Sequence, residues 1–303
     1  MNFVCVLDWC TELRNDEVPH PVWKIRDGQI ALDHPVIVGV LNVTPDSFSD
    51  GGVYLAPDDA KRHADEMIEE GADVIDVGGE STRPQGARAV SAEEERARVV
   101  PIVDWLRREH PAFPISVDTT KSTVARGALD AGVRIINDVS GGRLDMHLCD
   151  VVAEAGAGIV LMHSRGGVET MATYDFALYD HDPVRDIMHE LSASATRALE
   201  SGIPQESIVL DPGIGFAKRT EHSVAVLREI ERICSLGYPV MVGASRKRTI
   251  GELSGVHEPQ GRLAGTIAAH VVALMRGARL FRVHDVRPHR EALHVAWQIA
   301  LSS

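Results

Sequence analysis

Several features are missing from this 303-residue chain, and each absence narrows what it can be. No apolar run approaches the roughly 20 residues that cross a bilayer, and the first residues lack the basic and then apolar pattern of a signal peptide. The four cysteines form no CxxC pair and no disulfide framework, which is typical of free thiols in a reducing compartment. We therefore expect a soluble, cytoplasmic protein.

Motifs for three common chemistries are also absent. No GxxxxGK[ST] phosphate loop occurs, and the Gly213-x-Gly215 pair is followed by Lys218 where a dinucleotide fingerprint needs a third glycine. None of the fourteen histidines belongs to an HExxH, which disfavours a zinc hydrolase. The formal net charge of −13 disfavours nucleic acid and acidic membrane surfaces as partners.

What the chain does contain is a series of eight short apolar runs, each ending in polar, glycine-flanked residues. Continuous Val, Ile and Leu, rather than an alternating pattern, indicate parallel strands buried on both faces. A stretch that can form a helix follows each run, and this order predicts an α/β fold, a (β/α)8 TIM barrel with its active site at the carboxyl ends of the strands. The runs are residues 36–43, 74–77, 114–117, 134–136, 158–162, 208–210, 239–242 and 280–281.

The chain divides into an N-terminal extension, residues 1–21, and a single domain, residues 22–303. Residues 22–26 and 30–32 flank Asp27-Gly28-Gln29, which predicts an N-terminal β-hairpin that could plug the amino end of the barrel. Helices are predicted near residues 58–70, 92–110, 122–131, 145–155, 183–201, 221–236, 262–276 and 288–301. Long loops on the catalytic face are expected to be lids, and they cover residues 44–57, 79–90, 164–182 and 246–261.

Positive charge gathers at the predicted strand ends although the chain is acidic. The residues concerned are Arg83, Arg246, Lys247, Arg248 and Arg282. Arg282 and His284 occupy alternate positions of the last strand and so share one face, and Thr82 and Arg83 add donors from the second loop. Because barrels often bind phosphate near their last two strands, this pattern predicts an anionic, phosphate-bearing substrate.

Carboxylates end two of the apolar strands, where an unpaired charge would be costly to bury. Asp118 and Asp211 could each form a structural salt bridge or cap a helix. In the functional interpretation they act with Asn137 and read the donor edge of a planar heterocycle, because an ionised Asp accepts two parallel N–H bonds and Asn supplies both donor and acceptor. Lys247, on the next strand, could then meet a ring carbonyl or nitrogen.

Two further strand ends are weaker indicators. Asn42 offers a neutral oxygen ligand suited to Mg²⁺, although a lone Asn at a strand end is usually a turn residue. His163 is interpreted as a satisfied core or rim histidine without a chemical role.

Taken together, these motifs resemble those of the dihydropteroate synthases. The matching segments are GVLNVTPDSFSDGG (39–52), DVIDVGGESTRP (73–84), SVDTTK (116–121), INDVSGG (136–142), LDPGIGFAK (210–218), VGASRKR (242–248) and RVHDV (282–286). The likeness extends from about residue 22 to the C-terminus. It implies a (β/α)8 barrel that joins p-aminobenzoate to 6-hydroxymethyl-7,8-dihydropterin pyrophosphate, releasing pyrophosphate and 7,8-dihydropteroate. This is the step of folate biosynthesis that sulfonamides block.

The resemblance also implies roles for single residues. The pterin would be held by Asp118, Asn137, Asp211 and Lys247, with Gly243 allowing close approach of the ring. The pyrophosphate would be held by Thr82, Arg83, Arg282 and His284. The p-aminobenzoate pocket would be built from Phe48, Asp50, Arg83, Pro84, Phe216, Ser245 and the stem of Lys247. Of these residues, Asp50, Arg83 and Lys247 are expected to act in catalysis, and Asn42 would ligate Mg²⁺.

The chain departs from the family pattern in one catalytic loop. It reads Ser81-Thr82-Arg83-Pro84-Gln85-Gly86-Ala87, one residue longer than the usual STRPGA. The resemblance also predicts a homodimer. One helix face could mediate dimerisation or pack on the barrel, and it carries Ala264, Ile267, Ala268, Val271, Val272 and Met275.

Two other functions remain as alternatives. A pterin-binding methyltransferase of corrinoid systems shares the barrel and the pterin pocket, but would not need the pyrophosphate contacts of Arg282, His284 and the Ser245-Arg246-Lys247 segment. A catalytically silent pterin-binding paralogue would be expected to lose one of four residues, all of which are present: Asn42, Asp118, Lys247 and Arg282. The absence of a Ser–His or Cys–His pairing signature is consistent with a dissociative reaction that uses no enzyme nucleophile.

Overall fold

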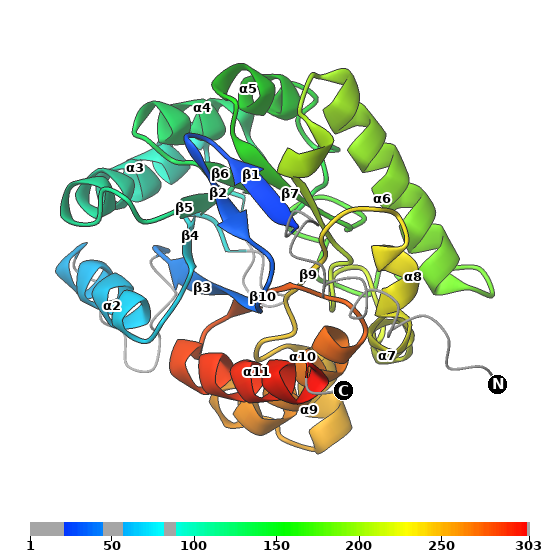
Figure 1. The fold of residues 1–303 in the computed structure, drawn as a ribbon. Coiled ribbons are helices and arrows are strands. Elements are labelled where there is room, and N and C mark those ends of the chain that lie inside the picture. The colour runs from blue at the N-terminus through cyan, green and yellow to red at the C-terminus, as the bar shows by residue number, and fades with distance from the viewer. Residues whose placement is uncertain (1–20, 45–56, 82–88, 302–303) are drawn as a thin grey trace.

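The computed structural model describes residues 21–44, 57–81 and 89–301. Within these residues eight parallel strands form the centre of the fold, and helices surround them (Figure 1). The strands are β3 (Val36–Asn42), β4 (Val74–Gly78), β5 (Ile115–Asp118), β6 (Ile135–Asp138), β7 (Gly158–Met162), β8 (Ile208–Asp211), β9 (Met241–Val242) and β10 (Leu280–Val283). They pair in the order β8-β7-β6-β5-β4-β3-β10-β9, and a bridge between Leu210 and Val240 brings β8 to β9. The predicted (β/α)8 barrel is confirmed.

The helices follow the strands as the periodicity predicts. They are α2 (Pro57–Glu69), α3 (Ala92–Glu109), α4 (Ser122–Asp130), α5 (Leu148–Ala155), α6 (Pro183–Glu200), α7 (Thr220–Arg228), α8 (Ile230–Cys234), α9 (Arg248–Ser254), α10 (Leu263–Met275) and α11 (Val286–Leu301). Short 3₁₀ turns occur at Gln205–Ser207 and Pro259–Arg262. The predicted start of α3 is confirmed, because the Ser91 hydroxyl accepts a hydrogen bond from the Glu94 amide at 3.1 Å.

Two predicted elements differ from the structure. The helix predicted over residues 221–236 is two helices, because Glu229 leaves helical geometry with φ −124° and ψ 30°. The loop predicted over residues 246–261 contains α9, which ends at Gly255 in the left-handed conformation that glycine adopts without strain. A seven-residue helix is too short to show a clear apolar period in the sequence.

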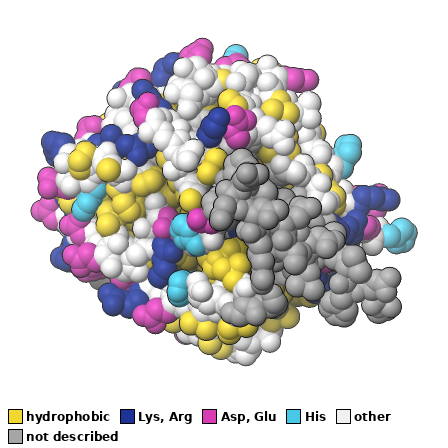
Figure 2. Space-filling view, in the orientation of Figure 1, with side chains coloured by type: hydrophobic (Ala, Val, Ile, Leu, Met, Phe, Trp, Pro, Cys, Tyr) yellow, Lys and Arg dark blue, Asp and Glu magenta, His cyan; other side chains and the backbone are white. Residues whose placement is uncertain are grey.

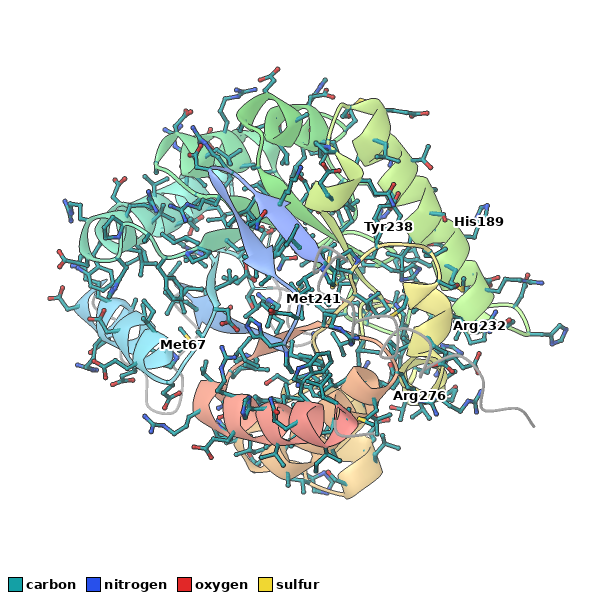
Figure 3. All side chains as sticks on the ribbon, in the orientation of Figure 1. Met67, His189, Arg232, Tyr238, Met241 and Arg276 are labelled. Carbon is teal, nitrogen blue, oxygen red and sulfur yellow. The ribbon has the colours of Figure 1, made fainter. Side chains whose placement is uncertain are left out.

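The predicted N-terminal hairpin covers the amino end of the barrel. Strands β1 (Val22–Ile25) and β2 (Gly28–Ala31) pair antiparallel and lie across the barrel in Figure 1. Trp23 is buried, and its indole N–H donates to the Ser207 carbonyl at 3.0 Å. Its ring packs in a cluster with inward-facing residues of the strands, including Met241, which lies near the barrel centre in Figure 3. The plug leaves the carboxyl end of the barrel as the place for a site.

The outward faces of the strands pack on the helices in a second, larger apolar cluster. Met67 of α2, labelled in Figure 3, shows how close this contact is: a Cβ added at Gly39 would lie 2.9 Å from its sulfur.

Figure 2 shows Lys, Arg, Asp and Glu side chains spread around the rim of the same view. None of the helices in the described part of the chain is long and apolar enough to span a membrane.

Candidate active site

Side chains from four strands meet around one guanidinium at the carboxyl end of the barrel. Arg282 of β10 donates from Nε to Asp76 Oδ2 at 2.7 Å and from Nη2 to Asp118 Oδ2 at 2.8 Å. The Asn137 amide nitrogen also donates to Asp76 Oδ2, at 3.0 Å. The predicted convergence of Asp118, Asn137 and Arg282 is therefore present, and a second carboxylate organises it.

Asp76 is the residue that sequence reasoning missed. It lies inside β4, is completely buried and faces the barrel mouth through its contacts with Asn137 and Arg282. Its signal is a carboxylate within an otherwise apolar strand, because a buried charge needs a partner of opposite sign. Among the described residues, Asp76 Oδ1 and Asn137 Oδ1 are buried acceptors without a hydrogen-bond partner. Unpaired acceptors at a site mouth are where N–H donors of a ligand would bind.

Asp211, at the end of β8, lies on the other side of the mouth. Its Oδ1 accepts from the Gly213 amide at 2.7 Å, which stabilises the turn after β8 and caps no helix, because the next helix begins at Thr220. A Cβ added at Gly243 would lie 3.8 Å from Asp211 Oδ2 and 3.7 Å from the Cβ of Arg282. Gly243 therefore leaves room between these two side chains, as expected for close approach of a flat ring.

Lys247 closes the site beside Phe216. Its Nζ lies 3.8 Å from the centre of the Phe216 ring, a cation–π contact. Gly215 has a left-handed backbone with φ 78°, and a Cβ there would touch the Lys247 stem at 3.5 Å. The structure thus brings together Lys247 and Phe216, which the sequence assigned to adjoining subsites.

The ionisable groups of the mouth are strongly desolvated. Burial raises the pKa of Asp118 to about 7, against the lowering effect of Arg282, and raises the pKa of Asp211 to about 6. Burial, followed by the charge of Arg282, lowers the pKa of Lys247 to about 7. Clusters of perturbed acids and bases in a cleft are typical of functional sites.

The segment after β10 contributes one residue to the site and one to the scaffold. The His284 amide and its Nδ1 lie 3.2 and 3.0 Å from the Ser245 hydroxyl, so these two predicted site residues contact each other. Asp285 instead holds the Arg246 guanidinium through two contacts of 3.1 and 2.6 Å. Arg246, one of the cations that the sequence places at the mouth, therefore anchors the turn that carries Ser245 and Lys247.

The remaining predicted site residues are only partly described. Phe48, Asp50, Thr82, Arg83, Pro84 and the additional Gln85 lie outside the described residues. Asn42 ends β3, and its Oδ1 would be 3.4 Å from a Cβ at Gly78. In the part of the chain that the structure describes, no group of three or more His, Cys, Asp and Glu side chains could hold a metal ion.

A parallel (β/α)8 barrel with this mouth belongs to the class of enzymes that bind a small, polar, anionic ligand at the carboxyl ends of the strands. The comparisons with known proteins define the family. A family model described as pterin binding enzyme matches residues 38–284. The dihydropteroate synthase of Mycobacterium leprae is 44% identical over 268 residues, which are 86% of this chain and 93% of that protein.

Solved structures agree with this match. The Xanthomonas albilineans dihydropteroate synthase with 4-aminobenzoic acid is 42% identical, covers 94% of this chain and 99% of its own, and has a TM-score of 0.85. The Yersinia pestis enzyme in a sulfonamide drug complex is 37% identical, covers 93% and 100%, and also has a TM-score of 0.85. This chain belongs to the pterin-binding enzyme family, as one of its dihydropteroate synthases. Members of this group are transferases of folate synthesis.

Proposed function

We propose that this chain condenses 6-hydroxymethyl-7,8-dihydropterin pyrophosphate with p-aminobenzoate to give 7,8-dihydropteroate and pyrophosphate. The observation that carries the proposal is the joint presence of buried acceptors and partly buried cations at one barrel mouth, in a chain of this family. The acceptors suit the N–H groups of an aminopyrimidine, and the cations suit a pyrophosphate. The matched family contains dihydropteroate synthases, which supports this activity over the corrinoid methyltransferase alternative.

The pterin would lie between Asp211 and Asn137. An ionised Asp211 offers Oδ2, and the second lone pair of Oδ1, to two adjacent N–H groups of the ring. Asn137 offers its unpaired Oδ1, and its amide is fixed in orientation by Asp76. Lys247 would donate to a ring carbonyl or nitrogen, and Gly243 would let the ring approach the backbone.

The pyrophosphate would leave from the side of Arg282 and His284, with Thr82 and Arg83 as further donors. Fixed positive charge in a desolvated site stabilises negative charge that develops in the transition state. The bond between the pterin methylene carbon and the pyrophosphate oxygen would break, and the resulting cation would bond to the amine nitrogen of p-aminobenzoate held near Phe216, Ser245 and the Lys247 stem. The proton that this nitrogen loses would pass to solvent. Phe48, Asp50, Arg83 and Pro84 would complete that pocket. No side chain needs to act as a nucleophile in this sequence of events.

Mg²⁺ fits this donor set only as an ion that the protein and the substrate hold together. Asn42 offers one oxygen beside Gly78, and no carboxylate cluster accompanies it in the described residues. Mg²⁺ commonly keeps several waters and binds through few protein oxygens together with substrate phosphates. We propose that Asn42 and the substrate pyrophosphate hold the ion, which supplies positive charge for the leaving group.

The reaction itself is the first prediction. Purified protein should release pyrophosphate only when Mg²⁺, the dihydropterin pyrophosphate and p-aminobenzoate are all present, as followed by a coupled pyrophosphate assay. A sulfonamide should reduce the rate by competing with p-aminobenzoate. Omitting either substrate is the control, and absence of turnover in the complete mixture would leave the silent paralogue as the better description.

The second prediction concerns pH. Because Asp211 must be ionised to accept two N–H bonds, pterin affinity should fall as the pH falls through about 6, the pKa of Asp211. Well below that pKa, each further pH unit should weaken binding about tenfold. Titration calorimetry with the pterin between about pH 5 and 8 measures this fall in affinity, which is called the acid limb below. Asp118 and Lys247, with pKa values of about 7, titrate in the same range, so Asp211→Asn identifies the part of the limb that belongs to Asp211. A flat profile would show that Asp211 does not bind the pterin as a carboxylate.

Homodimerisation and a cytoplasmic location are further parts of the proposal. Val272 and Met275 on α10 keep 45% and 44% of their surface exposed, although both are large apolar residues. An apolar helix face that does not pack on the barrel suits a contact between two copies. Sedimentation analysis of Val272→Glu against the native chain tests this, because the variant should stay monomeric if the face is the contact.

A further inference from the structure

A series of three contacting titratable side chains lies behind Asp211: Lys218, His163 and Glu190. The mechanism above uses none of them. Lys218 is 1% exposed, and its Nζ donates to His163 Nδ1 at 2.7 Å and to the Phe216 carbonyl at 3.1 Å. The other ring nitrogen of His163, Nε2, lies 3.1 Å from Glu190 Oε2. The His163 side chain is 1% exposed and that of Glu190 is 37% exposed. The series therefore runs from the buried Lys218 amine to the Glu190 carboxylate at the surface.

These contacts define which atoms of the three side chains carry protons. Because Lys218 donates to Nδ1, a neutral His163 carries its proton on Nε2, which faces Glu190. Burial, followed by the charge of Lys218, lowers the pKa of His163 to about 4, so the ring stays neutral near pH 7. Partial burial would raise the pKa of Glu190, but His163 and Arg165 lower it to about 2. Glu190 is therefore an anion 3.1 Å from Nε2 of a neutral imidazole, and it acts on the ring through its charge, because this contact lacks hydrogen-bond geometry.

The same histidine holds the segment that carries Asp211. The His163 amide donates to the Asp211 carbonyl at 2.8 Å, where β7 and β8 run side by side. A Cβ added at Gly213 would fall 2.0 Å from the His163 carbonyl oxygen, so the turn after Asp211 rests directly on this residue. Lys218 then fastens the Phe216 carbonyl at the other end of the turn. Segment 211–218 is thus attached to His163 at both ends.

The geometry points to a positioning relay. We propose that Glu190, His163 and Lys218 together hold segment 211–218 and place the Lys218 ammonium behind Asp211, so that Asp211 stays ionised for the pterin. These residues touch no substrate in this arrangement and act through Asp211 and Phe216. The inference rests on the proposed function, because it takes Asp211 as the pterin ligand.

The charges around the relay are consistent with this role. The groups that face it are Asp211 on β8, Lys247 after β9, Arg165 after β7, Tyr179 before α6 and His222 on α7. Burial lowers the pKa of Lys218 to about 7, and Asp211 opposes that shift. In return, Lys218 is one of the cations that lower the pKa of Asp211, after Lys247 and Arg282. Lys218 and Asp211 therefore each favour the charged form of the other.

The test is the acid limb of pterin binding in Lys218→Met. Loss of the ammonium should raise the pKa of Asp211 and move the limb toward neutral pH. Affinity at pH 8 should stay within about threefold, whereas affinity at pH 6 should fall about five- to tenfold, because one pKa unit is tenfold in the ionisation equilibrium. Calorimetry across that range gives both values. A limb that stays in place, or a loss of equal size at every pH, would overturn the proposal.

Two more variants make the result specific. Lys121→Met removes another lysine that bridges two carboxylates, Glu80 and Glu95, but does not belong to the relay. It should leave the limb where it is, and a shift of the same size there would contradict the assignment. Glu190→Gln keeps the side-chain shape at a partly exposed position, so it remains available if Lys218→Met does not fold. Because Glu190 raises the pKa of Lys218, Glu190→Gln should lower the fraction of Lys218 that is charged and move the limb in the same direction by a smaller amount. No movement would overturn the relay.

Failure of the relay and failure of the proposed function are distinguishable. Native protein that neither binds the dihydropterin pyrophosphate nor releases pyrophosphate would contradict the function. Native protein that turns over and shows the acid limb, while Lys218→Met and Glu190→Gln leave the limb unchanged, would contradict the relay alone.

Discussion

The Arg282→Ala variant should lose at least two orders of magnitude in kcat/KM and about 6–20 °C in melting temperature. Arg282 bridges Asp76 and Asp118, and Asp76 is completely buried. Removing one partner of a buried ion pair costs about 3–5 kcal/mol, because the other charge stays buried without compensation. The loss of rate has a separate cause, because removing one preorganised donor that stabilises transition-state charge costs about 10²–10³ in rate. In a chain of this size each kcal/mol moves the melting temperature by roughly 2–4 °C.

Ligand comparison separates the two roles of Arg282. If its guanidinium also binds the pyrophosphate, Arg282→Ala should weaken the pyrophosphorylated substrate more than free hydroxymethyl dihydropterin, as measured by calorimetry. Equal losses would mean that Arg282 serves only to hold the two carboxylates. Adding Asp76→Asn to the variant removes one of the two carboxylates left without a partner, the completely buried one, so melting temperature should partly recover while activity stays low.

The sequence was sufficient for the barrel and for the outline of the mouth, because both follow from local patterns. Apolar runs predict buried parallel strands, and the carboxyl ends of such strands meet at one end of a barrel. Asp118, Asn137, Asp211, Lys247 and Arg282 accordingly lie together. Their neighbourhood depends on strand order, which the β-then-α repetition already implies.

The partners of these residues were less predictable. Arg282 and Asp76 are 206 positions apart, and Lys218 and His163 are 55 apart. No local pattern reports that a lysine following a strand turns inward, because lysine side chains are ordinarily solvated. His163 is buried as predicted, but its interpretation as a residue without a role did not anticipate the contact with Lys218. The loop lids at residues 44–57 and 79–90 lie mostly outside the described residues, so those expectations remain predictions.

Asp211→Asn should weaken pterin binding roughly ten- to a hundredfold while leaving the fold intact. In the native protein Oδ1 is held by the Gly213 amide, and Oδ2 faces the space beside Gly243. An asparagine can keep its oxygen on Gly213, which preserves the turn, and then presents an NH₂ group where the ring also presents donors. Losing a charge-assisted, two-point contact costs about 1.5–3 kcal/mol, which gives the stated range of affinity. Calorimetry with the pterin at about pH 8, well above the pKa of Asp211, measures the loss.

Asp138→Asn is the matched control for this change. Asp138 ends β6, which β7 separates from β8, and it is similarly buried. Its carboxylate accepts from the Ser140 amide and hydroxyl and from the Gly142 amide in its own loop. Because its oxygens are occupied there, that variant should lower thermal stability without a comparable loss of pterin affinity. The acid limb of binding near pH 6 should also disappear in Asp211→Asn, since the carboxyl that titrates is gone, and persist in Asp138→Asn. Unchanged affinity in Asp211→Asn, or an equal loss in both variants, would show that the Asp211 carboxylate serves the turn and that another group reads the pterin edge.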